Sequence, residues 1–296
     1  MENRLYKHLK TYFDLMQDSM SNAGFGYYQT ISTDSKNVLR QQMINTLLLR
    51  EMAILTELFQ KAKIPHVFLK GPLLGHILYK NDGFLPSMRH TEDIDILVPL
   101  SFMPSVFNIL GEYGYQYGGK RVSEKDCSDY IQSNQNGLFH CVHFPDMIRR
   151  HITLDLHFTS HKISPEISAD DYQAIAEEQC SRAENIEIAG SNYPYLCTID
   201  LLLSLCSHFA KHLLTAIQYV ACESQDITYP MPLMRLVDID LLLSHNQKDI
   251  ENSLPEIIIA AKRQHCVYPF AFCVSLIYPL VKWCANCSKL TFWQKC

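Results

Sequence analysis

Apolar residues recur along the chain with two periods, one typical of helices and one typical of strands. Between Asn37 and Lys63 they follow the helical period and form one stripe of Ile44, Leu47, Leu48, Met52, Leu55, Leu58 and Phe59. Apolar, β-branched runs at 64–69 and 94–98 predict buried strands. The runs at 137–144 and 151–158, separated by a Pro-Asp turn, predict an antiparallel strand pair.

The second half of the chain follows the helical period almost throughout. Besides 37–63, the pattern predicts helices at 6–20, 73–79, 103–112, 170–180, 198–214, 232–244, 249–266 and 267–284. The change from mixed to helical pattern lies between about 160 and 197. The chain is therefore expected to be α+β, with N-terminal helices at 1–62, a mixed core at 63–165 and a mainly helical domain at 166–296.

Composition places the chain among globular proteins with a sizeable core, since 47% of its residues are hydrophobic and 11% aromatic. The net charge of −5 and the lack of a dense Lys/Arg run argue against binding to long nucleic acids. The longest uncharged run, 266–281, contains two prolines and is shorter than the roughly 20 residues that span a bilayer. We therefore expect no membrane segment. Because the chain ends soon after this run, a truncated C-terminus stays open.

The cysteines indicate a reducing compartment. There are 11, an odd number without a regular framework, and the first residues lack the apolar core of a signal peptide. A cytoplasmic protein with mostly free thiols is expected. The one close pair, Cys284 and Cys287, would need two further ligands to hold zinc, so free thiols are the favoured interpretation there.

Two carboxylates, Asp93 and Asp95, lie within the apolar run at 94–98 or at its edge. Residues i and i+2 of a strand point to the same face, so both would project together while Ile94 and Ile96 enter a core. Two like charges held together in a protein are costly unless a cation binds them. The pair predicts a metal site, and Mg²⁺ or Mn²⁺ suits carboxylate ligands.

A third carboxylate, Asp155, lies on the predicted strand at 151–158 and shares its face with Thr153 and His157. Three clustered acids can hold two divalent ions about 3.5–4 Å apart, one for an acceptor hydroxyl and one for a triphosphate. His157 is expected beside this cluster as a supporting group. A simpler interpretation pairs Asp155 with Arg149 or Arg150.

Lys70 and Gly71 follow the first predicted strand and precede a short helix that starts at Pro72. Glycine permits close approach of the backbone to phosphate, and Lys70 adds positive charge. Arg89, just before the acidic strand, is a second candidate for phosphate binding. An ordinary ion pair between Arg89 and Glu92 is the simpler alternative.

These segments resemble the nucleotidyltransferases of the DNA polymerase beta superfamily, and above all its bacterial branch of uncharacterised nucleotidyltransferases. The resemblance runs from about 45 to 245 and includes His208, Lys211 and His212 in one helix and the segment 233–239 in the next. It implies a mixed sheet flanked by helices, with a helical domain behind it. The implied metal ligands are Asp93, Asp95 and Asp155. The family's Gly-Ser phosphate motif maps onto Lys70-Gly71, where Pro72 stands in place of the serine.

The activity implied is metal-dependent transfer of a nucleoside monophosphate from an NTP, with release of pyrophosphate. Lys70, Gly71 and Arg89 would hold the triphosphate. The acceptor stays open among a small molecule, a peptide, a protein side chain and a tRNA end. Two other functions also stay open: a glycosyltransferase that uses Asp-x-Asp with a nucleotide sugar, and a non-catalytic nucleotide-binding module.

His208 and His212 are four residues apart, so they share one helix face. No glutamate in the zinc-protease pattern accompanies them, and packing or contact with the acceptor is favoured over zinc binding. Arg235, Asp238 and Asp240 are expected to contact the substrate or to join the helical domain to the core.

Overall fold

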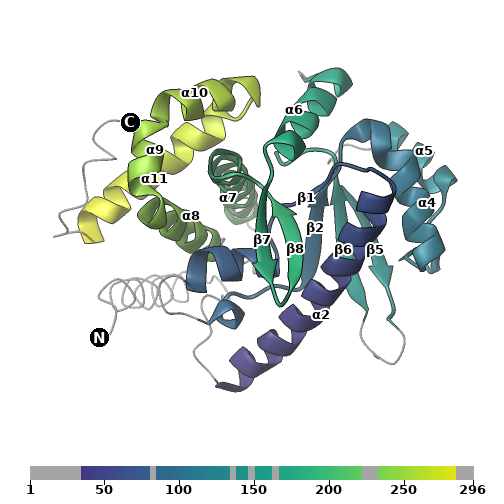
Figure 1. The fold of residues 1–296 in the computed structure, drawn as a ribbon. Coiled ribbons are helices and arrows are strands. Elements are labelled where there is room, and N and C mark those ends of the chain that lie inside the picture. Colours follow the sequence, from purple (N-terminus) through teal and green to yellow (C-terminus); the bar gives the residue numbers. More distant parts are fainter. Residues whose placement is uncertain are drawn as a thin grey trace.

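The computed structural model describes residues 35–80, 85–133, 138–145, 151–161, 167–221 and 233–284 (Figure 1). Within them lies one eight-stranded mixed sheet with the strand order β4-β3-β5-β6-β2-β1-β8-β7. The strands are β1 (Val67–Phe68), β2 (Asp93–Leu97), β3 (Gln116–Tyr117), β4 (Lys120–Arg121), β5 (Leu138–His143), β6 (Ile152–His157), β7 (Glu184–Ile188) and β8 (Ser191–Tyr195). The predicted α+β class, a mixed sheet flanked by helices, is confirmed.

The helices accompany the sheet at the start of the described chain and dominate its end. They are α2 (Ser35–Lys61), α3 (Pro72–Leu74), α4 (Met103–Tyr113), α5 (Glu124–Ser133), α6 (Ala169–Ser181), α7 (Thr198–Ala221), α8 (Leu233–His245), α9 (Gln247–Asn252), α10 (Leu254–Arg263) and α11 (Val267–Cys284). Short turns of other helix types occupy Gly75–Tyr79, Pro86–Met88 and Leu100–Phe102. The helix expected at 6–20 lies outside the described residues.

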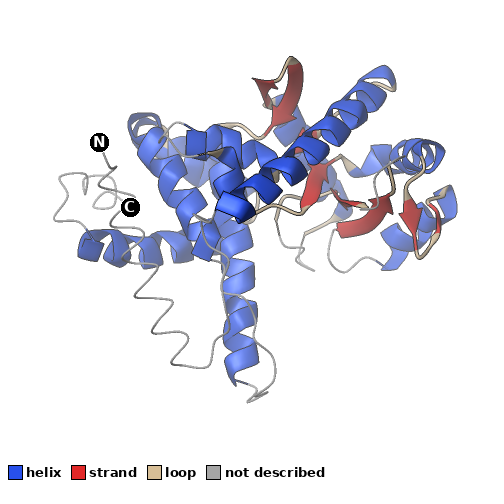
Figure 2. Ribbon diagram, turned by 90° about the horizontal axis from the view of Figure 1, so that it is seen from below, coloured by secondary structure: helices blue, strands red, loops and turns tan. Residues whose placement is uncertain are grey.

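Each face of the sheet has its own hydrophobic core. Ile94 and Ile96 of β2 enter the core shared with α2, α4 and α5, as their alternation predicts. On the other face, Leu97 joins the core formed with α7, α8, α10 and α11. Figure 1 shows α2 crossing the sheet on one side and α7–α11 gathered beyond it, and Figure 2 shows the same helices from below. Asp93 and Asp95 share the face of Leu97, which turns them toward the helical part.

Several elements differ from the sequence prediction. The helix expected at 249–266 is divided into α9 and α10 at Ser253, two residues before Pro255. The strand expected at 64–69 has only two residues in the ladder. The hairpin β7–β8 was not predicted; β8 pairs with β1 in parallel, so the sheet draws on residues beyond 165. The domain boundaries at 62 and 165 stay a prediction.

The expected antiparallel pair of strands is confirmed, because β5 and β6 pair from Leu138–His157 to His143–Ile152. Of the helices within the described ranges, none is long and apolar enough to cross a membrane.

Candidate active site

The three predicted carboxylates come together because β2 and β6 run parallel and in register. Asp95 lies opposite Asp155, and Asp93 lies opposite Thr153. All three acids therefore project from adjacent strands on the face that looks toward α7 and α8. The prediction that these acids form one cluster assumed that their two strands are neighbours in the sheet. The parallel pairing of β2 and β6 provides that neighbourhood.

Asp95 is the buried centre of the cluster, with 1% of its side chain exposed. Its Oδ1 lies 2.7 Å from Nζ of Lys70 and 3.0 Å from Nε2 of His157. Burial alone would raise the pKa of this carboxyl, but the charge of Lys70 and the bond from His157 outweigh burial and hold it well below its ordinary range. Its Oδ2 is buried and has no hydrogen-bond partner among the described residues.

The other two acids line the opening of the cluster. The negative charge of Asp95, and after it burial, raises the pKa of Asp93 to about 6. Asp155 accepts a hydrogen bond from Nδ1 of His140 at 2.7 Å. Arg149 and Arg150, its alternative partners, lie outside the described residues. His140 contacts this cluster while His143 contacts Glu51, so the two histidines lie on opposite faces of β5.

The Lys70-Gly71 turn lies directly against the cluster. Gly71 has φ +75°, and a Cβ added there would stand 3.3 Å from the carbonyl oxygen of Asp93. Glycine is therefore needed both for the backbone conformation and for the close approach to β2. Pro72 begins α3, as predicted.

Arg89 does not face the carboxylate cluster. It is 5% exposed, and its Nε and Nη2 donate to both carboxylate oxygens of Asp238 on α8 at 2.9–3.2 Å. Its Nη1 donates to the carbonyl oxygen of Gly71 at 3.2 Å and to the hydroxyl of Thr91 at 3.0 Å. The alternative ion pair with Glu92 is wrong, because the guanidinium of Arg89 pairs with Asp238 and the carboxylate of Glu92 lies against His90. Arg89 thus joins Asp238 of α8 to the Gly71 turn. This contact agrees with the expectation that Asp238 joins the helical domain to the core.

A pocket of about 270 Å³ opens above the carboxylates, between the sheet and the helical part. The strand side contributes Lys70, Asp93, Asp95, Asp155 and His157, and the helical side contributes His208, His212 and Arg235. Among the residues predicted for the site, this cavity is not lined by Gly71, Arg89, Asp238 or Asp240, and all the others line it. Gly71 adjoins the cluster through its close approach to Asp93, and Arg89 is joined to Gly71 by a hydrogen bond.

The pocket also contains residues that the sequence analysis did not assign to the site. Ser204, Ser207 and Lys211 from α7 line it, as do Thr159 and Ser160 beyond the end of β6. On α7 the polar positions 204, 207, 208, 211 and 212 recur every three or four residues within an otherwise apolar helix. That polar stripe was the sequence signal that could have identified the helical side of the pocket, which is the wall formed by α7 and Arg235 of α8.

His208, His212 and Arg235 form one chain of hydrogen bonds on this wall. Arg235 Nε donates to Nδ1 of His208 at 2.9 Å, and an arginine can only donate. His208 is then neutral with its proton on Nε2, which lies 2.9 Å from Nε2 of His212. Burial, and then the charge of Lys70, lower the pKa of His208 well below its ordinary value. Burial, and then Arg235, lower the pKa of His212 to about 3.

The donor set fits a hard divalent cation. Ligand atoms of Asp95, Asp155 and His157 all lie within 4.8 Å of one another, and Asp93 stands beside them. The unpartnered, buried Oδ2 of Asp95 is a ligand atom that no protein group satisfies. At Oδ1 the ammonium of Lys70 already supplies a positive charge. The prediction that Cys284 and Cys287 are free thiols rather than zinc ligands stays a prediction, because Cys287 lies outside the described residues.

Comparison with known protein families gives a match over most of the chain. Residues 35–279 match the model of a protein family described as "Uncharacterised nucleotidyltransferase". No curated protein sequence matches the chain. The matched range includes every residue of the pocket.

Proposed function

The chain belongs to this family of uncharacterised nucleotidyltransferases, and from that premise we propose a metal-dependent transfer of a nucleoside monophosphate from an NTP to an acceptor, with release of pyrophosphate. The observation that carries the proposal is the register of β2 and β6. It sets Asp93, Asp95 and Asp155 on one face, opposite a wall that bears Lys211 and Arg235. Acids on one side and cations on the other suit a metal-bound triphosphate between them.

The acids would hold Mg²⁺ or Mn²⁺, with Asp93 and Asp95 as ligands to both ions and Asp155 as a ligand on the acceptor side. When bound, the metal would supply Lewis-acid stabilisation of charge on the phosphates. We also assign to Asp155 the removal of the proton from an acceptor hydroxyl, because its side chain is 15% exposed and lies at the opening of the cluster. His140 and His157 would orient the carboxylates through the hydrogen bonds described above.

Lys70, Lys211 and Arg235 are the residues that we assign to the phosphates. Lys70 now neutralises Asp95, and a bound cation would free its ammonium for a phosphate oxygen. The neutral His208 and His212 would contact the acceptor or the nucleotide by hydrogen bonds rather than by charge. Arg89 would act indirectly, as a positioning residue that fixes the Gly71 turn.

The experiment is a transfer assay with NTPs labelled at the α-phosphate and a panel of alcohols, peptides, proteins and tRNA. We expect label in one acceptor class, with one pyrophosphate for each label. The double variant Asp93→Asn, Asp95→Asn should abolish transfer and metal-dependent binding of NTP. A control that removes two exposed carboxylates, Asp249→Asn with Glu256→Gln, should retain both.

Transfer that is unchanged in the Asp93, Asp95 variant would refute the proposed chemistry. Stabilisation by nucleotide sugars with Mn²⁺, but by no NTP with Mg²⁺, would instead assign the site to glycosyl transfer. Metal-dependent NTP binding without transfer to any acceptor class would favour the non-catalytic module.

A further inference from the structure

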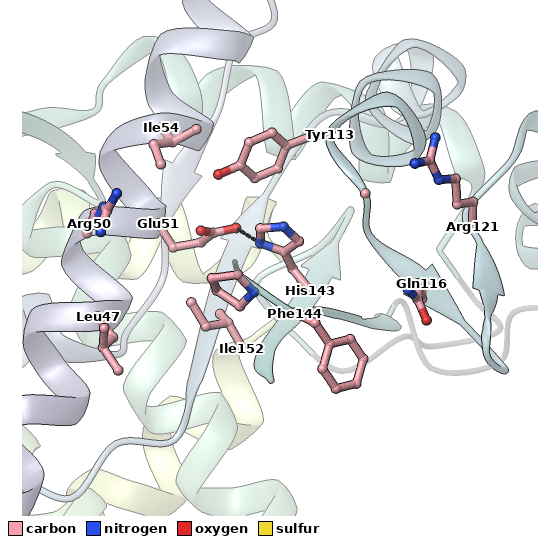
Figure 3. Close-up of a pocket in the computed structure, with 12 residues that line it drawn as sticks. Leu47, Arg50, Glu51, Ile54, Tyr113, Gln116, Arg121, His143, Phe144 and Ile152 are labelled. Carbon is pink, nitrogen blue, oxygen red and sulfur yellow. Dashed lines mark hydrogen bonds and ion pairs between the residues drawn. The ribbon is translucent and has the colours of Figure 1, made fainter. Parts of the chain in front are cut away.

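A second pocket lies on the other face of the sheet, where α2 packs. It measures about 490 Å³ and is bounded by α2, the end of α4 and the strands β3, β4 and β5 (Figure 3). None of its lining residues lines the pocket above the carboxylates. Whatever it binds is therefore held by different side chains from those that we assign to the NTP.

A buried carboxylate and an imidazole form the floor of this second pocket. Glu51 of α2 is 3% exposed and accepts hydrogen bonds from the hydroxyl of Tyr115 at 2.9 Å and from Nδ1 of His143 at 2.8 Å. The imidazole also stands near the rings of Tyr113 and Tyr115, with centroid distances of 4.7 Å and 5.1 Å. Ring contacts and the Glu51 bond together fix the orientation of His143.

That orientation leaves the second nitrogen of His143 for a ligand. Nε2 has no hydrogen-bond partner among the described residues, and 12% of the side chain is exposed. Beside it is Gly114, where an added Cβ would still stand 3.8 Å from Nε2. A Glu–His pair that served packing alone would have this edge covered by protein, whereas here it borders a cavity.

Positive charge and apolar surface surround the pair. Arg50 and Arg121 lie on opposite sides of it (Figure 3), and neither forms an ion pair with any described carboxylate. In a chain of net charge −5, two unpaired arginines on one pocket favour an anion. Phe144, 50% exposed, and Tyr113 add apolar surface at the rim.

We propose that this pocket binds a small organic anion, with its phosphate or carboxylate group between Nε2 of His143 and the guanidinium of Arg121. Its apolar part packs on Tyr113 and Phe144. An arginine recognises both oxyanions through the same planar set of donors. Because Nδ1–H of His143 donates to Glu51, Nε2 donates a directed bond to the anion when the imidazole is protonated. This site does not depend on the nucleotidyltransferase activity.

The test uses the full chain with three probes: phenyl phosphate, phenylacetate and inorganic phosphate. Binding is measured by calorimetry, and its place is read from the imidazole nitrogen signals of His143 in NMR spectra, assigned with His143→Gln. We expect saturable binding of at least one aromatic probe that moves the His143 signals. Comparison of the two aromatic probes distinguishes a phosphate from a carboxylate ligand.

Arg121→Met should weaken that binding about tenfold, the effect of one lost bond to a charged group. Its matched control is Lys120→Met, which removes an equally exposed cation from the neighbouring position of β4 and should change the affinity less than about twofold. Arg121 is exposed, so the comparison holds even if His143→Gln fails to fold. His143 signals that no probe moves, or equal affinities in the two surface variants, would overturn the proposal.

Discussion

Replacement of Asp238 by asparagine should destabilise the protein more than most single changes. Asp238 is fully buried and accepts bonds from Nε and Nη2 of Arg89 and, at 3.0 Å, from the hydroxyl of Tyr79. The variant keeps the shape of the side chain but leaves the guanidinium of Arg89 buried without a counter-charge. Loss of one partner from a buried ion pair costs about 3–5 kcal/mol.

The assay is urea unfolding of the wild type and the Asp238→Asn variant, followed by circular dichroism and analysed with a common slope. For a protein of this size each kcal/mol corresponds to about 2–4 °C in melting temperature, so a scan should show a decrease of roughly 10 °C. Glu187→Gln, an exposed acid on β7, is the matched control and should change stability by less than about 0.5 kcal/mol.

A double-mutant cycle separates the ion pair from general damage to the core. Arg89→Met with Asp238→Leu removes both charges and replaces them with apolar groups of similar size. It should be less destabilised than the sum of the two single variants, because each single variant leaves one buried charge unpaired and the double variant leaves none. A loss below about 1 kcal/mol in Asp238→Asn, or strict additivity in the cycle, would refute the assignment of this pair as the link between α8 and the Gly71 turn.

Four further outcomes are expected. Because the pKa of Asp93 is raised to about 6, protons should compete with Mg²⁺, and calorimetric Mg²⁺ affinity should fall as pH decreases through 6; an Asp93→Asn variant with the same pH slope would contradict this. The folded pKa of His212, about 3, lies below its unfolded value of roughly 6.5, so its contribution to stability is present above pH 6.5 and is lost progressively as the pH falls from there to about 3. His212→Gln should therefore flatten the acid side of the urea-stability profile, and an unchanged profile would count against burial as the cause. Lys70→Met should weaken Mg²⁺-NTP binding about tenfold in calorimetry, whereas Lys120→Met should not; equal affinities would exclude Lys70 from the phosphate site. Gly71→Ala should lower stability by about 1–2 kcal/mol in urea, because φ is +75° and the new Cβ would stand 3.3 Å from a backbone oxygen; no loss would show that the turn can relax.

Local patterns predicted the strands that carry the site. In β2 the alternation of Asp93 and Asp95 with Ile94 and Ile96 places acids and core on opposite faces, and the structure agrees. The same rule holds for Asp155 in β6. The parallel pairing of these two strands was not readable, because register depends on contacts between segments about 60 residues apart.

Long-range pairing explains what the sequence did not reveal. Arg89 stands next to the acidic strand, yet its partner is Asp238, 149 positions away, and nothing local distinguishes that partner from Glu92. The hairpin β7–β8 was missed because its alternation is weak and Pro194 interrupts a typical strand pattern. Its pairing with β1 is again a contact distant in sequence.

The central claim is that the acids of β2 and β6 hold a metal-bound triphosphate against α7 and α8. The most direct measurement is a crystal structure of the protein with Mg²⁺ and a non-hydrolysable NTP. We predict metal density at Asp93, Asp95 and Asp155, with the triphosphate reaching Lys70, Lys211 or Arg235. A nucleotide bound elsewhere, or one bound here without metal at the carboxylates, would contradict the account.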